Sequence, residues 1–455
     1  MPTIHEDVPN SKLRIIEDAT CTFCGCLCDD ITLRIEGDRI AEAQNACSLG
    51  QTWFLSRPQE DQPACLIDGQ PATLDEGIER AARILVESRY PLIFGLNETT
   101  SEAQRLAVAI ADWIAGCIDT TSDVCDGAPA IAFQEVGQVT CTLGEIRNRG
   151  DLIIFWGSDP AESHPRHFER YSLTPNGTFV PRGREDRYCV VVDESRTKSA
   201  EVADQFIPIK PGKDFEAFWV LRALARGIEL DPAESERATG VPLTTWQALM
   251  NRMRQAKYGV ILYGGRSTGS HRGHLDSHAL LALVRDLNDT TRFVCMRMID
   301  GGNRTGAENV LTWRTGYPFA VNLARGYPRY SPGEYNAGVL LERGESDAAL
   351  IVADDSTTRL SPAARNHLAR VPSIALVSND APMPPGATVM FHTATYGIST
   401  PGTVYRMDGV PIPLRPVVAS RLPTNEEILR RIESRVRAVT GSDERGTGSD
   451  QTGLR

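Results

Sequence analysis

Four cysteines near the start of the chain, Cys21, Cys24, Cys28 and Cys47, have a spacing that suits metal chemistry. In the pattern C-x2-C-x3-C-x18-C, one short loop supplies three thiolates and a later residue supplies the fourth. Such a loop can wrap an iron–sulfur cube, and we predict one [4Fe–4S] cluster here. Zinc and an unoccupied remnant are the alternatives, although zinc sites more often pair two C-x2-C knuckles. A disulfide is disfavoured, because neighbouring thiols would scramble and nothing marks the chain as secreted.

Two further segments carry side chains that suit anion binding. His164, Arg166 and His167 follow an apolar run at 151–160, and arginines pair with anions in bidentate geometry. A glycine pair and a cation, Gly264, Gly265 and Arg266, follow a second apolar run at 258–263. We predict cofactor binding at both segments. The alternatives at the first segment are a subunit-contact loop and a solvated helix start.

The elements that position these residues alternate between apolar β-branched runs and segments of helical period, which is typical of parallel α/β layers. Helices are expected at 72–90 and 100–116, and buried strands at 91–97, 151–160, 188–193 and 258–263. Ligands of open α/β sheets bind at the carboxyl ends of such strands. The fold class is therefore α/β. We expect a cysteine-rich domain at 1–60, a first α/β domain at 61–205 with 371–435, a second at 206–370, and a disordered tail at 436–455.

The composition narrows the function further. A net charge of −11 over 455 residues, with no lysine- or arginine-rich run, disfavours nucleic-acid binding. No apolar stretch approaches the ~20 residues of a membrane span. The start of the chain shows no signal peptide, so we expect a cytoplasmic protein. The scattered Cys65, Cys117, Cys141, Cys189 and Cys295 are expected to be core residues, and Cys26 a buried or loop thiol.

Several long motifs together resemble one family. They are CTFCGCLCDDI, NACSLG, TLGEIRNRGDLIIFWGSDPAESHPRHFERYS, WRTGYPFAVNLARGYPRYSPGE and TPGTVYRMDGVPIPLRP. From about residue 15 to about 430, the chain resembles the B subunits of formylmethanofuran dehydrogenase, within the molybdopterin oxidoreductase superfamily. The bacterial members belong to formyltransferase/hydrolase complexes of tetrahydromethanopterin-linked one-carbon metabolism.

The resemblance implies an iron–sulfur domain followed by two Rossmann-like three-layer domains around a cleft. That cleft would hold a molybdenum or tungsten bis-pterin guanine dinucleotide and, in the dehydrogenase form, interconvert carbon dioxide and formate. The implied partners are subunits of the A, C and D types and a furan carrier, methanofuran or methylofuran.

Two departures from the family pattern bear on the redox chemistry. The family's Cys-His-Gly-Pro stretch supplies a metal ligand and a catalytic histidine, whereas this chain has Cys125 followed by Asp126. An aspartate ionised at pH 7 repels formate and replaces a group that transfers protons near neutral pH. The family's Arg-Gly-His stretch is replaced by Ile299, Asp300 and Gly301. We therefore expect a degenerate site and a non-redox scaffold subunit; the alternative is an active tungsten or molybdenum subunit.

Overall fold

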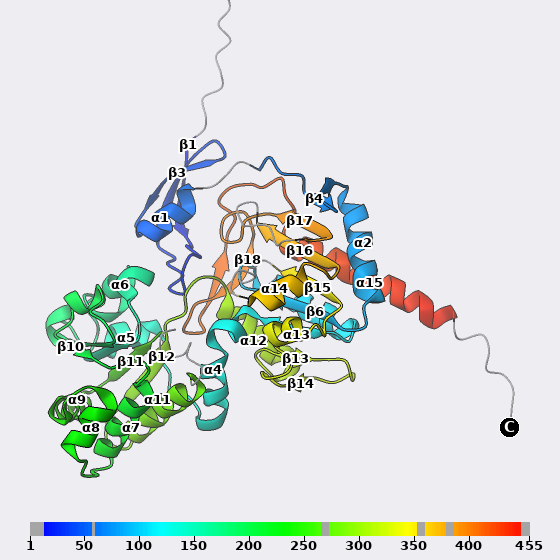
Figure 1. Ribbon diagram of the computed structural model, residues 1–455. Helices are drawn as coiled ribbons and strands as arrows, with labels where there is room; N and C mark the ends of the chain where they lie inside the picture. Colours follow the sequence, from blue (N-terminus) through cyan, green and yellow to red (C-terminus); the bar gives the residue numbers. More distant parts are fainter. Residues whose placement is uncertain (1–12, 57–59, 265–272, 353–359, 379–385, 447–455) are drawn as a thin grey trace, which may run out of the picture.

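The structure is a computed structural model and describes residues 13–56, 60–264, 273–352, 360–378 and 386–446. Its strands form a nine-stranded sheet, a five-stranded sheet, a three-stranded sheet and a two-stranded hairpin. Figure 1 shows two large α/β parts and a small β part that contains β1, β3 and α1. This arrangement confirms the predicted α/β class and the small part at the start of the chain.

The nine-stranded sheet is built on five parallel strands in the order β7-β6-β15-β16-β17. Antiparallel strands extend this block at both edges. The parallel strands are continuous apolar runs because helices cover both of their faces. The strands are β4 (Cys65–Ile67), β5 (Gln70–Pro71), β6 (Pro91–Gly95), β7 (Cys117–Thr120), β13 (Val321–Asn322), β14 (Arg329–Tyr330), β15 (Ala348–Val352), β16 (Ser373–Ser378) and β17 (Val389–Thr393).

The five-stranded sheet is parallel throughout, in the order β10-β9-β8-β11-β12. All of its carboxyl ends therefore meet at one edge, as the carboxyl ends of the parallel block do in the larger sheet. The strands are β8 (Leu152–Trp156), β9 (Tyr188–Asp193), β10 (Gln205–Pro208), β11 (Gly259–Tyr263) and β12 (Phe293–Arg297).

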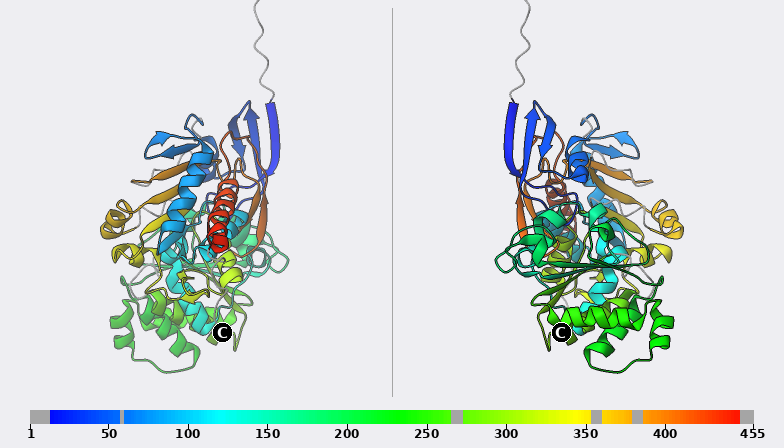
Figure 2. Two further views of the ribbon diagram at one scale, coloured as in Figure 1. Left: turned by 90° about the vertical axis from the view of Figure 1, so that its right-hand side faces the viewer. Right: turned by 90° about the vertical axis from the view of Figure 1, so that its left-hand side faces the viewer.

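Helices cover both faces of the nine-stranded sheet. Helices α2 (Leu74–Glu87), α3 (Ser101–Trp113), α12 (Arg304–Thr315) and α15 (Asn425–Gly446) share a core with one face. Figure 2 shows α2 and α15 lying side by side. The other face packs against α13 (Ala337–Glu342) and α14 (Pro362–Leu368). Both helices predicted after the cysteine-rich segment are confirmed, and Thr73 with Glu76 forms the capping box that starts α2.

The five-stranded sheet has one helical face and one mixed face. Helices α7 (Asp214–Ala225), α9 (Leu243–Gln255) and α11 (Gly273–Leu287) cover the first face. The second face shares its core with α5 (Leu143–Arg149), η1 (Phe168–Ser172) and the cysteine-rich part. The remaining helical elements are α4 (Thr121–Val136), α6 (Pro160–Ser163), η2 (Gly183–Asp186), η3 (Ser199–Glu201) and α8 (Pro232–Thr239).

The cysteine-rich part consists of an antiparallel sheet of β1 (Leu13–Ala19), β2 (Ile31–Glu36) and β3 (Arg39–Gln44), followed by α1 (Ser48–Leu55). The three-stranded sheet and helices α7 to α9 lie at opposite ends of the molecule (Figure 2). A hairpin of β18 (Gly402–Tyr405) and β19 (Pro411–Leu414) packs against Leu27 in the cysteine loop.

The sheets divide the chain differently from the predicted domain limits. The prediction places 61–205 with 371–435 and makes 206–370 a separate domain. In the structure β8 and β9 pair with β11 and β12, while β13 and β15 belong to the larger sheet. The five-stranded part is thus inserted between α4 and α12. Buried parallel strands are all short apolar runs, so their sequences do not reveal their neighbours.

The tail also differs from its prediction. Helix α15 continues to Gly446, so the expectation of disorder from residue 436 is wrong for 436–446. Val436 is buried, the Trp113 Nε1–H donates to Thr440 Oγ1 at 2.6 Å, and Arg437 lies over the Trp113 ring. These contacts hold the polar end of the helix to α3. Residues 447–455 lie outside the described residues.

Within the described part of the chain, no helix combines the length and the apolar character that a membrane crossing requires.

Candidate metal centre and cofactor cleft

The cysteine loop between β1 and β2 is closed by its own backbone. The Cys21 amide donates to the Cys28 carbonyl at 2.8 Å, and the Leu27 amide donates to the Cys24 carbonyl at 3.1 Å. Leu27 has a φ of 40°, a left-handed conformation that is uncommon for a leucine. This tight turn presents several sulfur atoms inward from one short stretch of chain.

The four predicted ligands lie around one cavity. Its lining includes all four of these cysteines and a fifth, Cys26. The rest of the wall is formed by Phe23, Ile31, Ala46, Pro165 and Arg166. The thiols are free, so no disulfide competes for them. Cys47 is the N-cap of α1, and its Sγ accepts the Gly50 amide at 3.4 Å. A Cβ at Gly50 would lie 3.3 Å from the Cys21 sulfur, so a glycine lets this helix start lie close to the ligand set.

The donor set of the cavity bears on which metal group it could hold. Among the described residues, no group of three or more histidine, cysteine, aspartate or glutamate side chains is placed to hold a metal ion. Four cysteines that line one cavity supply the number and type of donors that a [4Fe–4S] cluster takes. The residues therefore fit the predicted group, and their role as ligands stays a prediction.

The protonation of the thiols depends on what occupies the cavity. Burial raises the pKa of Cys28 to about 11, although Arg170 beside it acts in the opposite direction. Burial also raises the pKa of Cys21 well above its ordinary value. A hydrogen bond from Cys26 lowers the pKa of Cys24 to about 6. Most of these buried thiols are neutral at pH 7 unless positive charge, such as that of bound iron, stabilises their thiolates.

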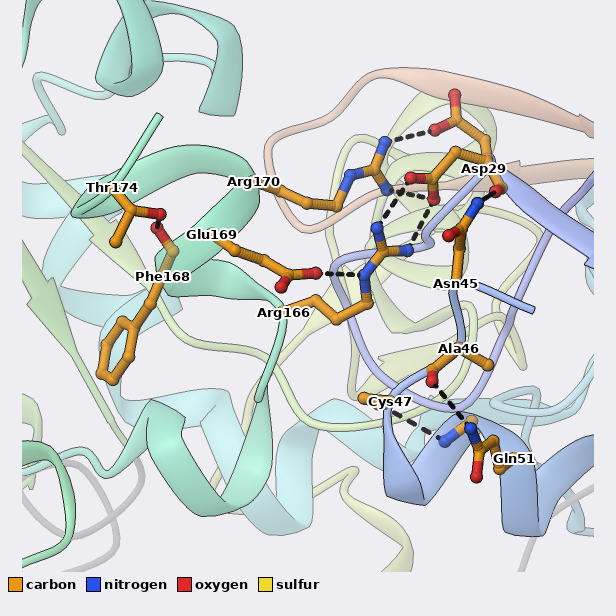
Figure 3. Close-up of polar contacts among 12 residues, drawn as sticks. Asp29, Asn45, Ala46, Cys47, Gln51, Arg166, Phe168, Glu169, Arg170 and Thr174 are labelled. Atoms are coloured by element: carbon orange, nitrogen blue, oxygen red, sulfur yellow. Dashed lines mark hydrogen bonds and ion pairs between the residues drawn. The ribbon is translucent and has the colours of Figure 1, made fainter. Parts of the chain in front are cut away.

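Two arginines join the cysteine loop to η1. Arg166 makes a bidentate pair with Asp30, at 2.6 and 2.7 Å, and Arg170 pairs with Asp29 at 2.8 Å (Figure 3). Burial raises the pKa of Asp30, but the Arg166 hydrogen bond and both guanidinium charges outweigh burial and hold this pKa below its usual range. Arg166, which we predicted to bind a cofactor, has its guanidinium engaged by Asp30 and Glu169. Its observed contacts position the cysteine loop.

The two histidines are buried between the elements that surround the loop. His164 Nε2 lies 2.7 Å from the Ile299 carbonyl oxygen, and its Nδ1 lies 2.8 Å from Ser163 Oγ. His167 Nδ1 lies 2.9 Å from Ser172 Oγ. Burial and the neighbouring His164 lower the pKa of His167 to about 3, so His167 is neutral at pH 7. The observed contacts of both rings are internal, and cofactor binding by them stays a prediction.

Of the remaining predicted site residues, Gly264 lies at a strand end. Gly264 follows β11, and a Cβ there would meet the Gly157 carbonyl at 2.6 Å, so its absence lets the ends of β8 and β11 pack closely. Gly265 and Arg266 lie outside the described residues. Cys125 and Asp126 belong to helix α4, directly after β7, and their side chains also lie outside the described part.

Buried polar atoms without partners mark the carboxyl edge of the nine-stranded sheet. Asn97 Oδ1, Thr120 Oγ1 and the Tyr396 hydroxyl are buried and have no hydrogen-bond partner within the described structure. They lie at or just beyond the ends of β6, β7 and β17, three parallel strands whose carboxyl ends meet at this edge. Because buried polar groups are almost always paired and open α/β sheets bind ligands at this edge, these three atoms are candidate contacts for a polar ligand. A pterin or its nucleotide supplies suitable donors and acceptors.

The loop after β12 connects the cysteine loop to the loop after β6. The Ile299 carbonyl accepts the Gly25 amide at 3.2 Å, and a Cβ at Gly301 would lie 2.5 Å from the Phe23 carbonyl oxygen. The Asn303 amide then donates to the Asn97 carbonyl at 2.6 Å. Ile299 and Gly301, two of the three residues in place of the family's arginine–glycine–histidine stretch, are thus packed against the cysteine loop, whereas Asp300 is exposed. At Gly301 no side chain fits without moving the Phe23 backbone.

Sequence reasoning missed two buried residues that organise the loops at this edge of the nine-stranded sheet. Asp119 is fully buried, and its carboxylate accepts the amides of Thr120, Ala320 and Ala337. Asn303 donates to the Thr99 carbonyl and accepts the Tyr405 amide. An aspartate within the apolar strand CIDT was a signal for the first residue, whereas nothing in the sequence marks the second.

Comparisons with known proteins agree with this architecture. No protein-family profile matches the chain. The B subunit of the tungsten-containing formylmethanofuran dehydrogenase 2 from Methanocaldococcus jannaschii is 37% identical over 413 residues, which span 89% of this chain and 94% of that protein. The protein of the same name from Methanococcus maripaludis is 35% identical, over 93% of this chain and 99% of the relative. The B subunit of the formyltransferase/hydrolase complex Fhc from Methylorubrum extorquens is 26% identical, over 64% of this chain and 74% of the relative.

Two solved structures share the fold. The formyltransferase/hydrolase complex from Methylorubrum extorquens, solved with methylofuran, contains a chain with a TM-score of 0.70 and 25% identity. That match covers 83% of this chain and all of the other. Acetylene hydratase from Pelobacter acetylenicus has a TM-score of 0.67 over 92% of this chain and 69% of its own, at 11% identity, which shows a shared fold alone.

Proposed function

Because the chain belongs to the family of formylmethanofuran dehydrogenase B subunits, we propose that it serves in a complex that handles formyl groups on a furan carrier. The similarity to one component of the Fhc complex, and to a chain of the complex solved with methylofuran, supports partners of the A, C and D types. The chain itself would link the iron–sulfur part to the cleft between the two sheets.

We propose further that the cysteine cavity holds one [4Fe–4S] cluster. Cys21, Cys24, Cys28 and Cys47 would be its ligands, since all four line the same cavity. The cluster would supply one-electron chemistry and also tie the loop to α1. Arg166 and Arg170 would hold the loop in place through their ion pairs with Asp30 and Asp29.

Within the complex, the chain would act as a scaffold that does not exchange electrons with formate. The observation that carries this proposal is the packing of Gly301 against the Phe23 carbonyl, which leaves no room there for the family's histidine. Ile299 brings no charge to hold formate, and Asp126 adds a carboxylate where the family has a histidine. A positioned base typically contributes ~10²–10⁴-fold to a rate, so the loss of these groups should leave no useful turnover.

A second candidate is an active tungsten or molybdenum pterin subunit that interconverts carbon dioxide and formate. It is favoured by the identity to tungsten-containing relatives, 37% and 35%, against 26% to the hydrolase-type relative. Asn97, Thr120 and Tyr396 would then hold the pterin or its nucleotide, and Cys125 would be the metal ligand.

The intact complex, prepared without oxygen, separates the two candidates. We expect hydrolysis or transfer of the formyl group from the formylated carrier and no reduction of benzyl viologen by formate. Metal analysis of the same sample reports whether tungsten or molybdenum is present. Viologen reduction that disappears in Cys125→Ser, together with bound tungsten or molybdenum, would refute the scaffold role and establish the second candidate.

A further inference from the structure

A large groove lies beside the cysteine loop. Its volume is about 610 Å³, and its walls include Arg147, Arg170, Arg406 and Tyr171. Arg170 and Arg406 lie on the Tyr171 ring, with 5.2 and 5.7 Å between guanidinium carbon and ring centre. Each of these two arginines has a carboxylate partner, Asp29 and Asp408 respectively. Arg147 is exposed and makes no ion pair with any described residue.

A second groove of about 340 Å³ lies at the amino edge of the five-stranded sheet. Arg149, Lys257 and Arg292 line it, with Asp151 among them. The Asp151 carboxylate already accepts the backbone amides of Lys257 and Tyr258, at 2.8 and 2.9 Å. Arg182 is also present but is held by Asp186. The second groove therefore also presents more positive than negative charge.

The strap formed by residues 176–182 separates the two grooves. Pro181 lines both of them, so they share one wall. Phe179, at the tip of the strap, is 63% exposed, and the Arg149 guanidinium lies 4.7 Å from its ring centre. The Phe179 amide donates to the Asn148 carbonyl at 2.9 Å, which fixes the strap on the end of α5. An exposed aromatic ring stacked with an arginine is typical of protein interfaces.

We propose that the two grooves and the strap form the docking surface for an acidic segment of a partner subunit. The chain has a net charge of −11, yet arginine and lysine are in local excess at this surface. A partner segment of complementary charge would therefore be acidic. A small anion would need a single compact binding site. Two grooves on either side of an exposed aromatic ring instead suit an extended polypeptide that has an apolar residue between its carboxylates. This inference rests on the proposed role within a complex.

The test compares intact complexes assembled with wild-type chain and with Arg147→Glu/Arg292→Glu. Both arginines are exposed, so their reversal should leave the fold unchanged. We expect the variant chain to dissociate at lower salt and about tenfold faster, which corresponds to ~1.4 kcal/mol. Arg80→Glu on α2, an exposed arginine far along the chain from the grooves, should behave as the wild type. Native mass spectrometry over a salt series gives these values.

A photo-crosslinking residue at position 179 then identifies the occupant. We expect a crosslink to a partner segment that contains several aspartates or glutamates. Unchanged dissociation of the Arg147→Glu/Arg292→Glu complex would overturn the proposal, as would a crosslink to a segment without acidic residues. Binding of an RNA oligonucleotide by the wild-type complex that the same substitutions abolish would assign the surface to nucleic acid instead. Failure of the wild-type chain to assemble with any partner would contradict the proposed function, not this inference alone.

Discussion

At the scale of single residues, the cysteine cavity holds five thiols for a cluster that needs four. Cys26 is fully enclosed and lines the cavity with the predicted ligands. The sequence pattern selects Cys21, Cys24, Cys28 and Cys47, because only they have the spacing of a cluster loop. The cavity alone does not make that selection.

Substitution of single cysteines distinguishes a cluster ligand from a cysteine that only lines the cavity. Cys21→Ser should lower bound iron from about four atoms per chain to a small fraction, because one corner of the cluster loses its thiolate. Cys26→Ser should retain the iron. Iron analysis and visible absorption after anaerobic purification measure both. Retention of iron in Cys21→Ser, or stoichiometric zinc in the wild type, would contradict the predicted ligand set.

The buried His167 predicts a dependence of stability on pH. Its folded-state pKa of about 3 lies below the ordinary value of 6.5, so the proton binds the unfolded state more strongly. The stabilisation is fully present above pH 6.5 and is lost as the pH falls from there toward 3. The slope approaches ~1.4 kcal/mol per pH unit.

His167→Asn keeps a side-chain donor near Ser172 and removes the titration. The free energy of unfolding of this variant should therefore fall less steeply than that of the wild type as the pH drops from about 6.5 to about 5. Denaturant unfolding at a series of pH values measures the two slopes. Equal slopes would show that His167 does not carry the effect.

At the scale of elements, the sequence predicted what each segment is, but not always where it ends. The capping residues Thr73 and Thr100 mark the starts of α2 and α3 because their side chains accept amides of the first turn. The end of α15 has no such local mark. Its last turns are polar, and the contact of Thr440 with Trp113 that holds them joins segments far apart in the sequence.

Burial of α15 against α2 and α3 should account for much of the stability of the larger sheet. Ile432 is fully buried in the shared core, and Ile432→Ala should destabilise the protein by about 2–5 kcal/mol. Arg430→Ala, on the exposed side of the same helix, should change stability by less than ~0.5 kcal/mol. Chemical denaturation of both variants checks the difference. A similar loss in both would mean that α15 contributes through its surface rather than its core face.

At the scale of the whole molecule, the larger sheet is discontinuous in sequence and the smaller one is not. The chain leaves the larger sheet after α4, builds the five-stranded part, and returns through the loop before α12. The outgoing connection lies along β12, since the Cys295 amide donates to the Val139 carbonyl at 2.9 Å. Sequence alone could not show this insertion, because β8 and β6 are equally apolar and each fits either sheet.

The insertion predicts an order of refolding. Amides that bond across the β8–β11 pair should become protected from hydrogen exchange before those across the β6–β15 pair, because β6 and β15 are farther apart in sequence. Pulse-labelled exchange during refolding, read by mass spectrometry, measures this order. Simultaneous protection of both sheets would show that they fold as one unit.

The insertion also sets a waiting time during synthesis. Strands β6 and β7 leave the ribosome long before β15, since residues 121–347 lie between them. At roughly 5–20 residues per second, the first strands spend roughly 11–45 s without their central neighbour. Their apolar edges are open during that interval, which is when a chaperone would protect this chain most effectively.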